Sequence, residues 1–170
     1  MPLGDRPILS YTLDLLKISG VQEVFVFCTS FANEIKAYLK NWSFDQGSNV
    51  MTINPIVNEE CRSFGDAMRD LDGQGVLRHD FILVFGDCIG NCDLSPLLKD
   101  HKKRAKEDKN AIMTLVNRKV TPGHHMRTMK NELLLAVNEK NKILHYARPG
   151  QELNCKVIDF IDRETSLTRS

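Results

Sequence analysis

The spacing of apolar residues predicts alternating helices and strands through the first hundred residues. Apolar positions at helical spacing predict helices over Pro7–Ile18, Ser30–Leu39 and Gly65–Leu71, and a fourth helix that carries Leu94, Leu97 and Leu98. Short β-branched and aromatic runs predict strands at Glu23–Cys28, Val50–Val57, Asp80–Phe85, Ala111–Val116, Glu132–Asn138 and Lys142–Tyr146. Ser19-Gly20 is expected to end the first helix, Ser30 to cap the second, and Asp93 or Ser95 to cap the fourth.

This alternation predicts an α/β fold, a doubly wound and mostly parallel sheet of Rossmann type, extended by a hairpin through Glu139–Asn141. Ligands of such sheets bind beyond the carboxyl ends of the strands. The segments expected there are Cys28–Ser30, Glu59–Cys61 and Gly86-Asp87. The aromatic residues expected in the core are Phe25, Phe27, Phe81 and Phe85.

Composition narrows the classes of partner. The chain has 170 residues, 23 Lys and Arg against 22 Asp and Glu, and a formal charge of +1, so no global basic field favours direct nucleic-acid binding. No apolar run is long enough to span a membrane. The five cysteines are odd in number and predict free thiols in a reducing, cytoplasmic setting. Cys88 and Cys92 lack the further ligands that a zinc site requires.

Two carboxylates are candidates for chemistry. Asp87 ends a predicted strand, where it could ligate Mg²⁺ or meet a sugar hydroxyl, although accepting backbone hydrogen bonds in a turn is the favoured interpretation. Asp66 follows Gly65 and would repel a nucleotide triphosphate. We expect Asp66 to act as an N-terminal helix residue or as the partner of Arg62 or Arg69.

The basic run Lys99–Lys109 is interrupted by acidic residues and contains no aromatic residue for base stacking, so a solvated helix face is expected. His124-His125 follows Pro122-Gly123 in an expected loop with too few neighbouring metal ligands. No nucleophile with a nearby base is evident, and we expect no catalytic residue and no metal site.

Several segments carry a family resemblance. They are Pro2-Leu3, Tyr11-Thr12-Leu13, Gly20–Glu23, Phe25–Cys28, Arg62–Asp66, Arg69-Asp70, Asp72, Phe85–Asp87 and Asn91. With them the chain resembles, over about residues 1–146, the nucleotidyltransferase-like domain of the epsilon-subunit family of translation initiation factor 2B, a guanine nucleotide exchange factor. A more distant resemblance is to sugar-1-phosphate nucleotidyltransferases.

The resemblance also implies departures from an active site. Active members of the wider family begin with a strand and a Gly-Gly-x-Gly-Thr-Arg loop that cradles phosphates, and neither is found in this sequence. Ser63 stands where the family has Pro, Asp66 where it has a small neutral residue, and the bulky Met68 follows. We therefore expect a domain over 1–146 truncated at both ends, an uncertain tail at 147–170, and only vestigial ligand-binding residues at Gly65, Asp66, Gly86 and Asp87.

The function that the resemblance implies is a non-catalytic scaffold within the exchange factor, which supports GDP/GTP exchange carried out by a domain outside this chain. Its partners would be sister subunits and, indirectly, initiation factor 2, without nucleic acid, membrane or cofactor. The alternative is a sugar-1-phosphate nucleotidyltransferase that uses Mg²⁺ on Asp87 and Gly65 against the base. A third possibility is a remnant that senses nucleotide sugars without turning them over.

Overall fold

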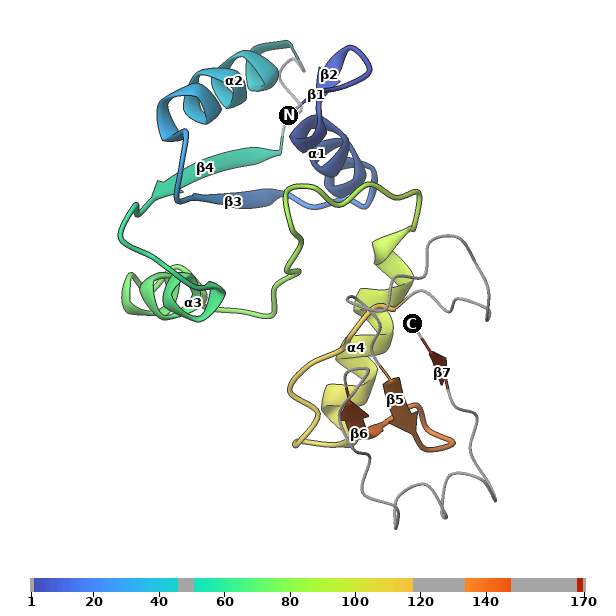
Figure 1. The fold of residues 1–170 in the computed structure, drawn as a ribbon. Coiled ribbons are helices and arrows are strands. Elements are labelled where there is room, and N and C mark those ends of the chain that lie inside the picture. The colour runs from blue at the N-terminus through green and yellow to red at the C-terminus, as the bar shows by residue number, and fades with distance from the viewer. Residues whose placement is uncertain (1, 46–50, 118–133, 148–167, 170) are drawn as a thin grey trace. The chain divides into compact units, whose positions relative to one another are not determined.

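The computed structural model describes residues 2–45, 51–117, 134–147 and 168–169. The chain divides into two compact units, residues 1–111 and residues 112–170 (Figure 1). Several predicted features lie outside the described residues, namely the start of the strand at Val50, the loop at Pro122–His125, Cys155 and almost all of the 147–170 tail. No helix in the described segments is both long and apolar enough to cross a membrane.

The first unit contains a small parallel sheet with helices. Its elements are β1 (Pro2–Leu3), β2 (Arg6–Pro7), α1 (Ile8–Ile18), β3 (Glu23–Cys28), α2 (Ala32–Asp45), β4 (Thr52–Val57), α3 (Phe64–Gly73) and α4 (Leu94–Glu107). β3 and β4 pair in parallel through the whole of both strands, from Glu23 opposite Thr52 to Cys28 opposite Val57. The predicted strand, helix and parallel strand over this stretch are therefore confirmed, and the unit has an α/β fold.

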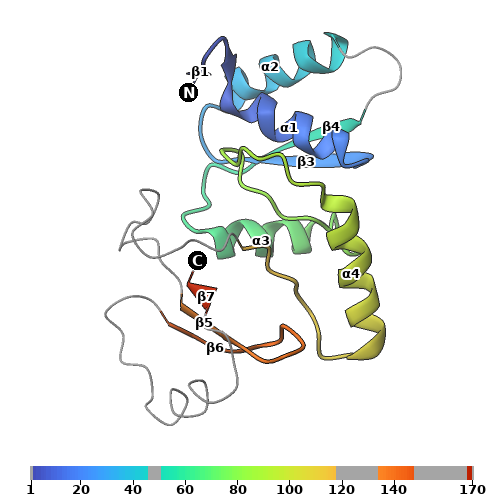
Figure 2. The ribbon, with the colours of Figure 1, turned by 90° about the vertical axis from the view of Figure 1, so that its right-hand side faces the viewer.

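The core of this unit lies between α1, α2 and the sheet. The buried residues of the cluster are Leu13, Leu16, Leu39, Trp42 and Met51, and Val24, Val26 and Ile53 of the sheet pack against them. Figures 1 and 2 show both helices on the same side of the β3–β4 pair. Every second residue of β3 faces these helices because side chains alternate along a strand.

Glycine ends α1 as the sequence predicts. Gly20 adopts a φ of +78°, its N–H donates to the Lys17 carbonyl over 3.0 Å, and the N–H of Val21 donates to the Leu16 carbonyl over 3.1 Å. This is the Schellman pattern, which satisfies carbonyls that the helix end leaves free. At the start of α2 the prediction of Ser30 as the cap is wrong, because Phe31 accepts the first helical hydrogen bond, from Ile35.

The prediction of a third strand at Asp80–Phe85 is wrong. These residues form no strand, and neither does the predicted run Ala111–Val116. A β-branched or aromatic run becomes a strand only when a neighbour completes its hydrogen bonds, and within the described residues the sheet of this unit has two strands. The doubly wound arrangement therefore stays a prediction.

The expected aromatic core is also mostly wrong. Phe25 is 37% exposed, Phe81 50% and Phe85 61%, and Phe27 is only partly buried. Phe25 is on the opposite face of β3 from Val24 and Val26, the residues that pack against the helices. The core of the first unit is therefore built from aliphatic residues, one methionine and Trp42.

The second unit contains a β-hairpin. β5 (Leu134–Val137) pairs antiparallel with β6 (Ile143–Ala147), and β7 (Thr168–Arg169) pairs with the other edge of β5. In the hairpin turn the Asn138 side chain accepts hydrogen bonds from the N–H groups of Lys140 and Lys142, at 3.0 and 2.9 Å. The hairpin predicted through Glu139–Asn141 is confirmed.

Candidate functional site: the start of α3 and the turn at Gly86-Asp87

The first turn of α3 is fixed by a reciprocal cap. The Ser63 hydroxyl accepts a hydrogen bond from the Asp66 N–H at 3.1 Å, and the Asp66 carboxylate accepts one from the Ser63 N–H at 2.9 Å. The same carboxylate oxygen also accepts from the Arg62 N–H at 3.2 Å. The two side chains thus accept hydrogen bonds from three N–H groups at the start of the helix, those of Arg62, Ser63 and Asp66.

Asp66 is engaged by its own chain. Its second carboxylate oxygen lies 2.6 Å from the Arg69 guanidinium. Hydrogen bonds from Ser63 and Arg69 lower the pKa of the Asp66 carboxyl, because both stabilise its charged form. The structural role expected for Asp66, as a helix N-terminal residue paired with an arginine, is confirmed.

The space beside Gly65 is covered by the same arginine. A Cβ placed on Gly65 would lie 3.5 and 3.8 Å from the two terminal nitrogens of Arg69 and 3.7 Å from the Ser63 hydroxyl. These are ordinary contact distances, so Gly65 is not required by a close approach of the backbone. A ligand that approached this glycine along the Cβ direction would contact the exposed Arg69 side chain.

The turn at Gly86-Asp87 is held against α1. The N–H of Cys88 donates to the Phe85 carbonyl at 3.0 Å and closes the turn. The buried Thr12 hydroxyl lies 2.8 Å from the Cys88 carbonyl and 3.3 Å from the Gly86 carbonyl, within donating distance of both. Sequence analysis named Thr12 only as part of the Tyr11-Thr12-Leu13 segment of the family resemblance and assigned its hydroxyl no role.

The start of α3 and the segment that leads into the Gly86-Asp87 turn are in contact through two aromatic rings. Phe64, at the start of α3, lies with its ring centroid 6.0 Å from that of Phe85, and the rings are inclined by 55°. Asn58, just beyond β4, donates to Asp70 of α3 at 3.1 Å and ties this helix to the sheet. The structure therefore brings the start of α3 close to the segment before Gly86-Asp87, although Gly86-Asp87 does not follow a strand as the sequence predicts.

Asp87 is exposed, and no hydrogen bond to its carboxylate is found among the described residues, so the favoured interpretation of Asp87 as an acceptor of backbone hydrogen bonds in the turn is wrong. Within the described segments, no group of three or more His, Cys, Asp or Glu side chains is placed to hold a metal ion. The roles of Gly65, Gly86 and Asp87 in binding a ligand stay predictions.

The cysteines of the described segments are free thiols. Cys28 is buried, Cys61 is intermediate, and Cys88 and Cys92 are exposed. Desolvation raises the pKa of Cys28, and desolvation followed by the nearby carboxylates of Asp70 and Asp66 raises that of Cys61. A raised pKa keeps a thiol protonated, so neither thiol is activated as a nucleophile.

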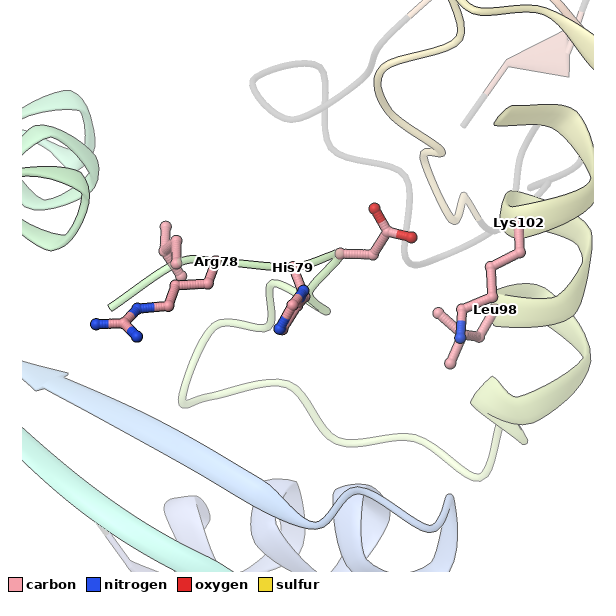
Figure 3. A pocket seen from close by; sticks show the side chains of 6 residues that line it. Arg78, His79, Leu98 and Lys102 are labelled. Atoms are coloured by element: carbon pink, nitrogen blue, oxygen red, sulfur yellow. The ribbon is translucent and has the colours of Figure 1, made fainter. Parts of the chain in front are cut away.

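An open cavity of about 720 Å³ lies in a different part of the first unit. It is lined by Leu77, Arg78, His79, Asp80, Leu98 and Lys102 (Figure 3). The first four come from the segment after α3, and the last two come from α4. Sequence analysis missed the Leu77–Asp80 segment, which carries no motif.

No protein-family model matches the chain. The chain is 40% identical over 147 residues to translation initiation factor eIF2B subunit epsilon of Schizosaccharomyces pombe, covering 86% of this chain and 22% of that protein. It is 37% identical to the Dictyostelium discoideum protein of the same description, covering 81% of this chain and 19% of that protein. The chain thus spans about a fifth of the length of these curated relatives.

More distant similarity extends to two other proteins. The S. pombe eIF2B subunit gamma is 24% identical, with 90% of this chain and 33% of that protein covered. A UTP–glucose-1-phosphate uridylyltransferase of Synechocystis is 22% identical, with 71% of this chain and 31% of that protein covered. The chain is therefore, over most of its length, a homologue of the epsilon subunit of translation initiation factor eIF2B, with a nucleotidyltransferase-like sequence.

Proposed function

We propose that this chain is a non-catalytic assembly domain of an eIF2B-type subunit that works in the cytoplasm. It belongs to a nucleotidyltransferase-like, doubly wound fold, pairs with sister subunits and contacts initiation factor 2 only indirectly. It needs no cofactor, nucleic acid or membrane. Similarity to both an epsilon and a gamma subunit supports this proposal, because two homologous domains can pair face to face in one complex.

The observation that carries the proposal is an exposed run of large apolar side chains. In the first unit, the residues with at least half of their surface exposed in this region are Phe64, Phe81, Leu83, Phe85 and Ile89. Single exposed apolar residues are common, but a run of this kind is typical of a protein–protein interface. An assembly role would cover these side chains with a partner.

The loop at the start of α3 supports the non-catalytic part of the proposal. Arg69 lies beside Gly65, and the Asp66 carboxylate accepts from the Ser63 N–H and pairs with Arg69. A nucleotide phosphate near this carboxylate would meet a like charge, which is unfavourable at short range. The Ser63–Asp66 cap therefore stabilises the helix in the place where an enzyme of the related type would hold a nucleoside.

Co-purification with single eIF2B subunits tests the assembly role. The chain is co-expressed with the gamma subunit or with another eIF2B subunit, and complexes are separated by size-exclusion chromatography. We expect a complex with a sister subunit that the double variant Phe81→Ser/Phe85→Ser weakens. The matched control Ile18→Ser changes an exposed apolar residue on α1 and should leave the complex intact. Failure to bind any subunit would contradict the proposal.

The second candidate is a nucleotide-sugar enzyme or sensor. It is favoured by the exposed Asp87 carboxylate and by the similarity to a uridylyltransferase. With Mg²⁺ and a panel of nucleotides and nucleotide sugars, thermal unfolding measures binding, since a ligand at 100 times its dissociation constant stabilises the folded state by about 2.7 kcal/mol. A shift that Asp87→Asn abolishes would favour this candidate over the assembly role.

A further inference from the structure

The exposed face of α4 carries a row of four lysines. Lys99, Lys102, Lys103 and Lys106 are all exposed and occur at positions i, i+3, i+4 and i+7 of one helix, so they share a face. We call these four residues the lysine stripe. Over seven residues at 1.5 Å each the stripe extends roughly 10 Å along the helix axis.

The acidic residues between these lysines do not neutralise the whole stripe. Asp100 is engaged by Arg104, one helical turn away, and both are only partly exposed. Glu107 lies 4.0 Å from Lys103, which forms a long and exposed ion pair. The interaction energy of such solvent-exposed ion pairs is small. The four lysines thus leave this face with an excess of positive charge, although Glu107 lies on the same face.

The stripe continues into the open cavity of the first unit. Lys102 belongs to both. Arg78 and His79 line the cavity from the segment after α3, and Figure 3 shows the Arg78 side chain pointing away from α4, where it donates to the Gly75 carbonyl at 3.0 Å. Leu77 and Leu98 add apolar surface beside these basic groups, and Asp80 is the acidic residue of the lining. A basic edge next to a mostly polar cavity that has two leucines in its lining favours a ligand that has negative charge and one apolar side chain.

We propose that the lysine stripe and this cavity dock an acidic, extended segment of a partner protein. An extended chain rises about 3.3 Å per residue, so three or four residues span the stripe, with one apolar side chain in the cavity. Charge complementarity is the basis for this occupant. A nucleic acid is less suited, because neither the stripe nor the lining has a Phe, Tyr or Trp on which bases stack, and Asp80 repels phosphate. This proposal is independent of the assembly role.

The test uses the 170-residue chain and a fluorescein-labelled peptide, Ser-Glu-Asp-Leu-Glu-Asp-Glu-Ser, with binding measured by fluorescence polarisation. We expect binding at low salt that weakens at about 0.3 M NaCl. Replacing all four stripe lysines by Gln should weaken binding at least about fivefold, since each exposed charge pair contributes a factor of roughly 1.5 to 5. Circular dichroism checks that this variant keeps its helices.

Two controls make the test specific. The variant Lys36→Gln/Lys40→Gln/Lys109→Gln/Lys140→Gln removes the same charge from exposed lysines elsewhere and should change the affinity less than about twofold. A control peptide with Gln and Asn in place of Glu and Asp should not bind the unaltered chain. This control does not depend on how the lysine variants fold. Equal loss in the two lysine variants, no binding by the unaltered chain, or equally tight binding of an RNA oligonucleotide of matched charge would overturn the proposal.

Discussion

Replacing Leu13 by Ala should destabilise the first unit far more than replacing Phe85 by Ala. Leu13 is 1% exposed and lies in the cluster with Leu16, Leu39, Trp42 and Met51. Truncating such a leucine removes its burial and leaves a cavity, so the free energy of unfolding should fall by about 2–5 kcal/mol.

Phe85 is expected to matter less because it is 61% exposed. It buries about 80 Å² of the roughly 200 Å² that a fully enclosed aromatic side chain buries. At about 25 cal/mol per Å² this burial stabilises the fold by at most about 2 kcal/mol. A core phenylalanine would instead cost about 3–5 kcal/mol.

The assay is urea unfolding followed by tryptophan fluorescence. Trp42 is the single tryptophan of the chain and is 6% exposed within the same cluster, so its emission reports on this core. With a slope of about 2 kcal/mol per M, Leu13→Ala should lower the urea midpoint by about 1–2.5 M. Ile18→Ala, on the exposed side of α1, is the control and should change little. Phe85→Ala as costly as Leu13→Ala would refute this account of the core.

Three further predictions concern the candidate site. Thr12→Val should lower the free energy of unfolding by about 1–3 kcal/mol, because it leaves the carbonyls at Gly86 and Cys88 without their buried hydroxyl partner; urea unfolding measures this, and an unchanged midpoint would contradict it. Folding lowers the pKa of Asp66, so the charged Asp66 carboxylate stabilises the folded state fully above the unfolded pKa of about 3.9, and this stabilisation is lost as the pH falls through the folded pKa. Asp66→Asn should therefore flatten the change in urea midpoint between about pH 6 and pH 2. An unaltered pH profile would count against the cap. Cys88 should be labelled by a thiol reagent well before the buried Cys28 in peptide-mapped mass spectrometry, and equal rates would show that Cys28 is accessible.

The sequence predicted the helices and the first parallel pair because their signals are local. These signals involve only residues close together in the sequence. They are the helical spacing in α1, the glycine at position 20 and the β-branched run of β3. The cap of α3 was also within reach, since a serine followed three positions later by an acidic residue is a capping pattern. Asp66 was correctly expected in a structural role.

The wrong predictions concern features that depend on distant neighbours. Phe81 and Phe85 belong to a run with high strand propensity, but a run is a strand only where another strand pairs with it. Their burial could not be inferred from hydrophobicity, because a core position also needs a covering layer. The contact of Thr12 with the turn beyond Phe85, and the cavity between α4 and the segment of Arg78 and His79, likewise depend on packing that no short motif records.

The most direct test of the central claim is native mass spectrometry of the purified chain mixed with purified eIF2B gamma subunit. The assembly role predicts a one-to-one complex that survives without nucleotide or Mg²⁺ and is lost in Phe81→Ser/Phe85→Ser. A chain that is folded by circular dichroism, stays alone with every eIF2B subunit and binds a nucleotide sugar would contradict the claim.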